Sequence, residues 1–145
     1  MFVLHPVKSF LQNAFAVVGV SSETSENEAS FNMNLLIIED NDKMRRMIRN
    51  IVADLAERID ECADGDEALS LYEAGQPDFV LMDIQMKNTN GIQTTREIVA
   101  SYADARIIIV TNYNDETFRE SAREAGAFAY VLKENLLEVR RILEE

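Results

Sequence analysis

Four apolar stretches in this sequence each end in polar residues that could act together on a phosphoryl group. The stretches are residues 35–38, 79–82, 107–110 and 130–132. The polar residues that follow them are, in chain order, Glu39 with Asp40, Asp83, Thr111 and Lys133. If the stretches are parallel strands of an open α/β sheet, their carboxyl ends form the edge where ligands bind. The sequence then predicts a site at one edge of the sheet that combines three acids, a hydroxyl and an ammonium group.

Three carboxylates at one edge predict a divalent cation. Two carboxylates about 4 Å apart repel each other by about 4 kcal/mol at an effective dielectric constant of about 20. Glu39, Asp40 and Asp83 would therefore retain a proton or bind a cation. Mg²⁺ takes oxygen ligands, keeps several of its waters and is commonly shared with phosphate oxygens. We therefore expect Mg²⁺ as the cofactor of this site.

The same groups predict a reaction, the attack of a carboxylate on phosphorus. Asp83 is expected to be the nucleophile and to form an acyl phosphate, as in enzymes with an aspartyl-phosphate intermediate. Lys133 would neutralise charge on the transferring group, and Thr111 would donate a hydrogen bond to it. Taken singly, Asp83 could be a turn former, Thr111 a β-branched strand residue and Lys133 a solvated charge. Their occurrence together, each after its own apolar stretch, favours the site.

The composition is that of one acidic globular domain. The 145 residues are 47% hydrophobic, and no apolar run approaches the roughly 20 residues of a membrane helix. The formal net charge of −12, from 14 Lys and Arg against 26 Asp and Glu, disfavours direct nucleic-acid binding, which needs clustered cations. Cys62 is the only cysteine, so no disulfide can form within this chain and a cytoplasmic location is expected. We expect Cys62 to be a buried structural thiol.

The first 32 residues differ in character from the rest, so we expect a flexible N-terminal tail over 1–32 and a domain over 33–145. Residues 14–20 form a small apolar patch, and residues 21–30 are polar and rich in Ser and Glu, as linkers are. A signal peptide is the alternative, with Lys8 as its positive end and 14–20 as its apolar core. The positive end is weak and the apolar run is short, so the tail is favoured.

Strand-like and helix-like segments alternate from Leu35 onward, which indicates a parallel sheet with helices on both faces. Strands are expected at 35–38, 58–62, 79–82, 107–110 and 129–132. Helices are expected at 42–55 with Asp42 as N-cap, after the turn 64–66 up to Gly75, around 92–102, and at 114–125 and 136–143. These segments predict a single α/β domain with a doubly wound, five-stranded parallel sheet.

The first expected helix also carries a basic cluster, made of Arg45, Arg46 and Arg49. Such a cluster is usually a solvated helix face, and that interpretation is favoured here. In an acidic protein it could also dock a partner, which is the alternative.

The motifs around the site resemble those of response-regulator receiver domains of two-component signalling, over residues 34–144. The resemblance is carried by 36–40 (Leu-Ile-Ile-Glu-Asp), 80–86 (Val-Leu-Met-Asp-Ile-Gln-Met), Gly91, Val110-Thr111 and 126–133. It implies the flavodoxin-like receiver fold, five βα units in one domain. The segment 133–136 is similar to receivers that elsewhere precede a helix-turn-helix DNA-binding domain.

The resemblance implies a switch whose only chemistry is its own phosphotransfer and dephosphorylation. Asp83 would accept a phosphoryl group from a histidine of a sensor kinase or of a phosphotransfer protein. The Mg²⁺ ligands would be the side chains of Glu39, Asp40 and Asp83 and the main-chain carbonyl of Gln85.

The resemblance also implies how the signal leaves the domain. Thr111 and Tyr130 would be a switch pair, in which Thr111 moves to the phosphoryl group and Tyr130 repacks inward. A phosphoryl group adds about −1.5 to −2 charges, enough to bias a two-state surface over the fourth helix and the fifth strand. This surface would control a downstream protein partner. Receivers often pair through this face, so a phosphorylation-dependent homodimer is a further expectation.

Several positions depart from what is usual in the family. Asn112 stands where Ala, Ser or Gly is usual, and its bulk is expected to narrow access to Asp83. Glu134 and Lys87 each replace a frequent proline, so we expect no cis peptide after Lys133 and a looser loop around Lys87. Gln85, Asn112 and Tyr113 are expected to tune the lifetime of the phosphoryl group.

Three other functions compete with that of a phosphorylated switch. A receiver could serve as a phosphorylation-independent interaction module, with Asn112 and the loop changes disfavouring phosphorylation. A phosphohydrolase of the haloacid-dehalogenase type expects a second acid two residues after the nucleophile, where this chain has Gln85. A flavin-binding module expects a Ser/Thr/Gly-rich loop after the first strand, where Glu39 and Asp40 would repel a phosphate. No output domain follows Glu145 here, so we expect either a stand-alone receiver or a piece of a longer regulator.

Overall fold

A computed structural model of the protein describes residues 32–145. The predicted tail, except for its last residue, and the alternative signal peptide lie outside the described residues, so both stay predictions.

Five parallel strands form one sheet in the order β2-β1-β3-β4-β5. They are β1 (Met33–Ile38), β2 (Ala56–Cys62), β3 (Phe79–Met82), β4 (Ile107–Thr111) and β5 (Ala129–Leu132). Strands β3 and β4 are buried at every position, because helices cover both faces of the sheet and leave no solvent side for polar residues. The edge strand β2 is instead mostly polar and partly exposed.

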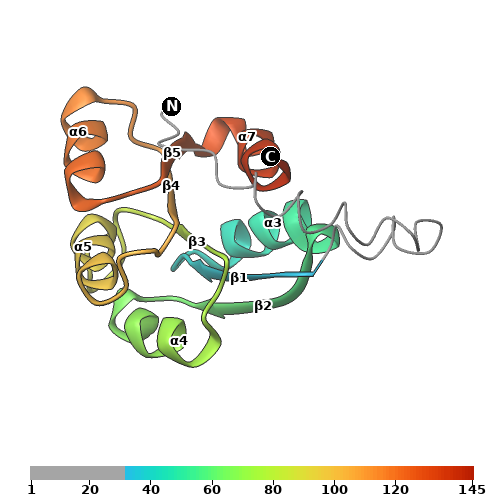
Figure 1. The fold of residues 1–145 in the computed structure, drawn as a ribbon. Coiled ribbons are helices and arrows are strands. Elements are labelled where there is room, and N and C mark those ends of the chain that lie inside the picture. The colour runs from blue at the N-terminus through green and yellow to red at the C-terminus, as the bar shows by residue number, and fades with distance from the viewer. Residues whose placement is uncertain (1–31) are drawn as a thin grey trace.

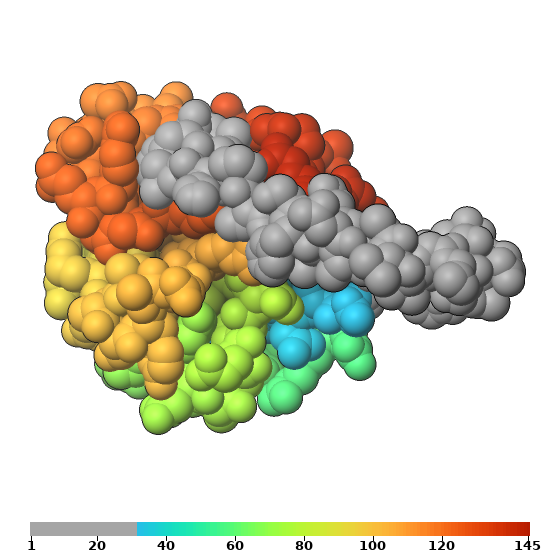
Figure 2. Space-filling view, viewed as in Figure 1, coloured from blue at the N-terminus to red at the C-terminus, as the bar shows by residue number. Residues whose placement is uncertain are grey.

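Within residues 32–145, five α-helices pack against this sheet, and Figure 1 shows them divided between its two faces. They are α3 (Asp42–Val52), α4 (Ala68–Gly75), α5 (Gly91–Ser101), α6 (Glu116–Ala125) and α7 (Leu137–Glu144). Short 3₁₀ turns lie at Ala53–Leu55, Gly65–Glu67 and Lys133–Asn135. In the space-filling view α5 lies between α4 and α6 (Figure 2). None of the helices in residues 32–145 is long and apolar enough to cross a bilayer.

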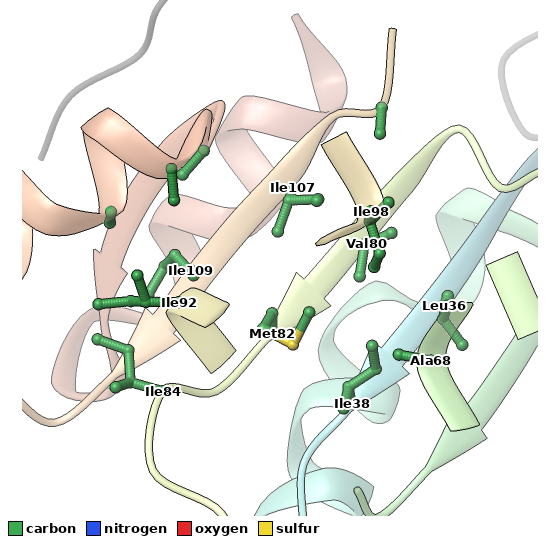
Figure 3. Close-up of a cluster of buried hydrophobic side chains, with 14 of the residues drawn as sticks. Leu36, Ile38, Ala68, Val80, Met82, Ile84, Ile92, Ile98, Ile107 and Ile109 are labelled. Carbon is green, nitrogen blue, oxygen red and sulfur yellow. The ribbon is translucent and has the colours of Figure 1, made fainter. Parts of the chain in front are cut away.

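The core consists of two clusters, one on each face of the sheet. The first joins Leu36 and Ile38 of β1 to side chains of α4, α5 and α6. Figure 3 shows this cluster, with Val80, Met82, Ile107 and Ile109 of the central strands facing Ile92, Ile98 and Ala68 of the helices. The second cluster joins the alternate residues Leu35 and Ile37 to α3 and α7. Successive strand residues thus face opposite clusters, and the doubly wound prediction is confirmed.

The helix starts correct the sequence prediction in two places. Asp42 is not the N-cap of α3, so that prediction is wrong. The cap is Asn41, whose extended backbone precedes the helix and whose Oδ1 accepts a hydrogen bond from Met44 N at 2.8 Å. Helix α6 likewise starts two residues later than predicted, because Asp115 caps it through a 2.9 Å hydrogen bond from Phe118 N.

The end of α4 agrees with the prediction that Gly75 closes it. The left-handed residue that ends the helix, however, is Gln76, at φ 45° and ψ 59°. Its main-chain N–H donates to the Tyr72 carbonyl at 2.7 Å, so the last turn is closed without a glycine in the left-handed position.

Candidate functional site

The predicted site residues meet at the carboxyl edge of the sheet. Because β1, β3, β4 and β5 are neighbours in the sheet, the residues that follow them come together although they are far apart in sequence. Glu39, Asp83 and Thr111 are buried, at 1%, 7% and 0% exposure, and Asp40 is half-buried. The burial of ionisable groups at a strand edge indicates a built site rather than a solvated surface.

The Lys133 ammonium lies between two of the acids. Its Nζ is 2.9 Å from Glu39 Oε1 and 3.1 Å from Asp83 Oδ2, and only 9% of the Lys133 side chain is exposed. Burial lowers the pKa of Lys133, but its close contact with Glu39 and the charge of Asp83 raise that pKa overall. Lys133 is therefore a fixed positive charge beside the Asp83 carboxylate.

Asp83 differs from an ordinary aspartate because its charged form is disfavoured. Burial, together with the nearby charge of Glu39, raises the pKa of Asp83 to about 6, against the opposing effect of Lys133. Oδ1 of Asp83 accepts a hydrogen bond from the main-chain N–H of Ile84 at 2.8 Å. The carboxyl group is therefore held in one orientation by Ile84 on one oxygen and by Lys133 on the other.

The acid cluster fits a divalent cation. Carboxylate oxygens of Glu39, Asp40 and Asp83 lie within 4.8 Å of one another. Glu39 Oε1 is buried and makes no hydrogen bond, although it is in ion-pair contact with Lys133. Three carboxylates against the one Lys133 ammonium leave excess negative charge at the site, which favours binding of a hard cation by these oxygens.

The predicted main-chain ligand, Gln85, is in the loop between β3 and α5. Gln85 and Asn90 form an isolated antiparallel bridge. The hydrogen bonds of this bridge run from Met86 N to Thr89 O, at 3.2 Å, and from Gly91 N to Ile84 O, at 2.6 Å. The Gln85 carbonyl takes no part in the hydrogen bonds of this bridge, and its role as a cation ligand stays a prediction.

The two predicted switch residues are both fully buried. Thr111 Oγ1 accepts a hydrogen bond from Tyr113 N at 3.2 Å. The Tyr130 hydroxyl donates to the main-chain carbonyl of Tyr113 at 2.7 Å, and the Arg119 guanidinium carbon lies 4.7 Å from the Tyr130 ring centre. Burial raises the pKa of Tyr130 to about 12, so its hydroxyl stays a donor. Thr111 and Tyr130 are thus joined through one residue, Tyr113.

A contact that the sequence did not predict joins two of the tuning positions. The Tyr113 hydroxyl donates a hydrogen bond to Gln85 Oε1, and its ring stacks on Phe118 with ring centres 4.9 Å apart. Gln85 is two residues beyond Asp83, and Tyr113 is two residues beyond Thr111. The hydrogen bond therefore links the loops that follow the neighbouring strands β3 and β4. Asn112, between Thr111 and Tyr113, is exposed.

Most of the basic cluster on α3 is paired within the domain. Arg45 contacts Glu61 of β2 at 3.1 Å and Asp42 at 2.7 Å, and it donates to the Glu39 carbonyl at 2.6 Å. Arg49 also pairs with Glu61. Arg45 thus supports the segment that carries the acid pair, a role with no signal in the sequence. Arg46 is exposed.

The prediction for Cys62 is confirmed. Its side chain is buried, at 7% exposure, and its Sγ contacts the Asp64 carbonyl at 3.3 Å. Burial raises the pKa of the thiol to about 11, so Cys62 is a protonated structural residue at neutral pH.

The doubly wound sheet and the acid–lysine cluster at its carboxyl edge define a receiver-type signalling domain. The family model for the response regulator receiver domain matches residues 35–144. The chain belongs to this family, whose members act in two-component regulatory systems.

Individual relatives agree with this assignment. The chain is 37% identical over 99 residues to the chemotaxis protein CheY of Halobacterium salinarum, covering 68% of this chain and 82% of that protein. It is 36% identical over 116 residues to the transcriptional regulatory protein YhcZ of Bacillus subtilis, covering 76% of this chain and 54% of that protein. The crystal structure of a LuxR-family response regulator from an Aurantimonas species has a TM-score of 0.71 at 30% identity, over 77% of this chain and 85% of the other. The chain spans about half the length of the transcriptional regulators that it matches.

Proposed function

We propose that Asp83 accepts a phosphoryl group from a phosphohistidine of a sensor kinase or a phosphotransfer protein. The observation that carries this proposal is the geometry of Asp83, whose carboxylate lies 3.1 Å from the Lys133 ammonium beside Glu39 and Asp40. In the reaction an Asp83 oxygen forms a bond to phosphorus while the bond from phosphorus to the donor nitrogen breaks. The products are an acyl phosphate and a free imidazole, which takes up a proton.

Receiver domains bind Mg²⁺ at an acidic pocket, and here the ligands would be Glu39, Asp40, Asp83 and the Gln85 carbonyl. The cation would neutralise negative charge on the transferring group. Lys133 would hold one phosphoryl oxygen by its charge. The Thr111 hydroxyl, which is already polarised by Tyr113 N, would turn to donate to another.

A conformational change at the phosphorylated site would reach the surface of the domain through the switch pair, Thr111 and Tyr130. The added charge of about −1.5 to −2 draws the Thr111 hydroxyl toward the phosphoryl group. Because Tyr113 contacts both Thr111 and Tyr130, a shift of Thr111 changes the packing beneath Arg119 of α6. The surface of α6 and β5 would then bind or release a downstream protein partner, or a second copy of the chain. We place this activity in the cytoplasm, where phosphohistidine donors occur.

A phosphorylation-independent interaction module is the second candidate function. The burial of Asp83, which is only 7% exposed, supports it, because a buried carboxylate is less accessible to a phosphodonor. Such a module would bind its partner with an affinity that does not depend on Mg²⁺ or on phosphodonors.

Phosphorylation by a small donor separates the two candidates. The protein is incubated with Mg²⁺ and acetyl phosphate, or with a phosphorylated kinase, and hydroxylamine-labile phosphate is measured. We expect label on the wild type and on Asp104→Asn, an exposed aspartate outside the site, and none on Asp83→Asn. A wild-type protein that takes no label from either donor would rule out the proposal and favour the module.

A further inference from the structure

The loop after β3 contains Gln85, whose main-chain carbonyl is the proposed cation ligand. This loop is hydrogen-bonded to the loop after β2 through the carboxylate of Asp64. Asp64, which follows β2, accepts a hydrogen bond on Oδ1 from the Thr89 hydroxyl at 2.9 Å and one on Oδ2 from Asn88 Nδ2 at 3.0 Å. The main-chain N–H of Gly65 donates back to Thr89 Oγ1 at 2.9 Å. The Thr89 hydroxyl therefore donates one hydrogen bond to the Asp64 loop and accepts another from it.

The loop after β3 is a small hairpin with the site at its base. The bridge between Gln85 and Asn90 closes its base, next to Asp83, and Lys87 and Asn88 form its tip, because the Thr89 carbonyl accepts a hydrogen bond from Met86 N. Asn90 also caps α5, because its Oδ1 accepts from Ile92 N at 2.8 Å. Since the bridge with Asn90 fixes Gln85 at the base and Asp64 holds Asn88 and Thr89 beyond it, the backbone of Gln85 has little freedom.

Glycine packing shows how tightly the two loops approach each other. A Cβ atom at Gly65 would lie 2.4 Å from Thr94 Oγ1 and 2.8 Å from Thr89 Oγ1. A side chain at Gly65 would displace these two threonine hydroxyls, so the turn that presents Asp64 lies in direct contact with Thr89 of the hairpin and Thr94 of α5. The contact therefore also counters the looser loop expected from Lys87.

We infer that Asp64 is a positioning residue, which holds the hairpin so that the Gln85 carbonyl faces the cation site before Mg²⁺ binds. The inference rests on the proposed function, because that function assigns Gln85 to the cation. Without its contacts to Asp64, the hairpin would be less ordered before Mg²⁺ binds. The entropy cost of ordering it on binding would weaken Mg²⁺ binding by about tenfold. Asp64 itself touches neither the cation nor the reacting atoms.

Substitutions at Thr89 test this role with little change in shape. Thr89→Val removes the hydroxyl that Asp64 and Gly65 both use, and Thr89→Ser restores it. Asp66→Asn is the matched charge control, since Asp66 is exposed and only its main-chain N–H contacts Asp64. Two quantities are measured: hydrogen exchange of the Met86 and Gly91 amides without Mg²⁺, and the Mg²⁺ dissociation constant by calorimetry of the unphosphorylated protein.

We expect faster exchange and about tenfold weaker Mg²⁺ binding for Thr89→Val, and wild-type values for Thr89→Ser and Asp66→Asn. Asp64→Asn, which keeps a cap for the following turn but loses the acceptor for Asn88, should give an intermediate result and serves if Thr89→Val does not fold. Unchanged exchange and affinity in both variants would overturn the positioning role, with the proposed function intact. A wild type that binds no Mg²⁺ would instead overturn both.

Discussion

Lys133 Nζ lies 3.1 Å from Asp83 Oδ2, in a site where the lysine and aspartate side chains are only 9% and 8% exposed. The same nitrogen is 2.9 Å from Glu39 Oε1. The Lys133 ammonium thus pairs with two buried carboxylates, those of Glu39 and Asp83. It neutralises only half of their combined negative charge. This imbalance of charge determines how the stability of the protein depends on Lys133 and on the ionisation of Asp83.

Replacing Lys133 with methionine should destabilise the protein in the absence of Mg²⁺. The variant Lys133→Met leaves Glu39 and Asp83 facing each other without a cation, and breaking a buried ion pair costs about 3 kcal/mol. Excess Mg²⁺ should recover part of this loss, because it supplies the missing positive charge. Urea denaturation at alkaline pH, with EDTA or with Mg²⁺, measures both effects. Lys87→Met, an exposed lysine in the neighbouring loop, is the control and should change neither curve. Equal losses with and without Mg²⁺ would contradict this account.

Replacing Asp83 with asparagine should stabilise the metal-free protein at neutral pH. The pKa of Asp83 is raised from 3.8 to about 6 by burial and by Glu39, so ionising it costs free energy only in the folded state. The wild type therefore loses stability as the pH rises from about 4 to about 6, whereas Asp83→Asn does not. Above pH 6 the variant should be more stable by about 2 kcal/mol, with part of the shift screened by solvent. Denaturation in EDTA across this range tests it, with Asp104→Asn as the matched control. Parallel pH profiles for the wild type and Asp83→Asn would argue against the raised pKa.

A methyl group at Gly91 should disrupt the site from the backbone side. An added Cβ would lie 1.8 Å from the Asp83 carbonyl oxygen and 3.0 Å from Ile84 Cα, and neither backbone atom can move aside cheaply. Gly91→Ala should therefore lower the free energy of unfolding by about 3 kcal/mol and reduce phosphorylation. Gly75→Ala is the control, because its Cβ would meet only the ends of two flexible side chains, Asp60 Oδ2 at 3.0 Å and Arg58 Nη2 at 3.9 Å. It should change stability by less than about 1 kcal/mol. Similar stabilities for the two variants would count against the close approach at Gly91.

The contact between Tyr113 and Gln85 should act as one unit on the phosphoryl lifetime. Tyr113→Phe and Gln85→Ala each remove the same hydrogen bond, which restrains two loops beside Asp83. Each should shorten the lifetime by about fivefold, as expected for a hydrogen bond of about 1 kcal/mol, and the double variant should be no shorter than either single one. Loss of labelled phosphate with time measures this. Tyr102→Phe, whose ring packs against Tyr72, is the control for a lost hydroxyl. Additive effects in the double variant would show that the two side chains act separately.

The strands could be predicted because the burial of a strand restricts the types of residue that it can contain. Strands β3 and β4 are covered on both faces, so they must be apolar throughout, and their predicted bounds agree with the structure to within one residue. The start of α3 was mispredicted for an equally physical reason. Asn41 and Asp42 are both good caps, and the choice between them depends on backbone angles that composition does not reveal.

The sequence by itself determined which chemical groups stand at the strand ends, because a polar residue after a buried strand must emerge at the sheet edge. The strand order β2-β1-β3-β4-β5 was decided only by tertiary packing, and it determines which loops become neighbours. The contacts of Asp64 with Thr89, of Arg45 with Glu61 and of Tyr113 with Gln85 all depend on that order. These pairs are 25, 16 and 28 residues apart and join polar side chains in loops or on exposed faces. Such contacts impose no periodicity on the sequence, so the residues that place and tune the Asp83 site became visible only in the folded chain.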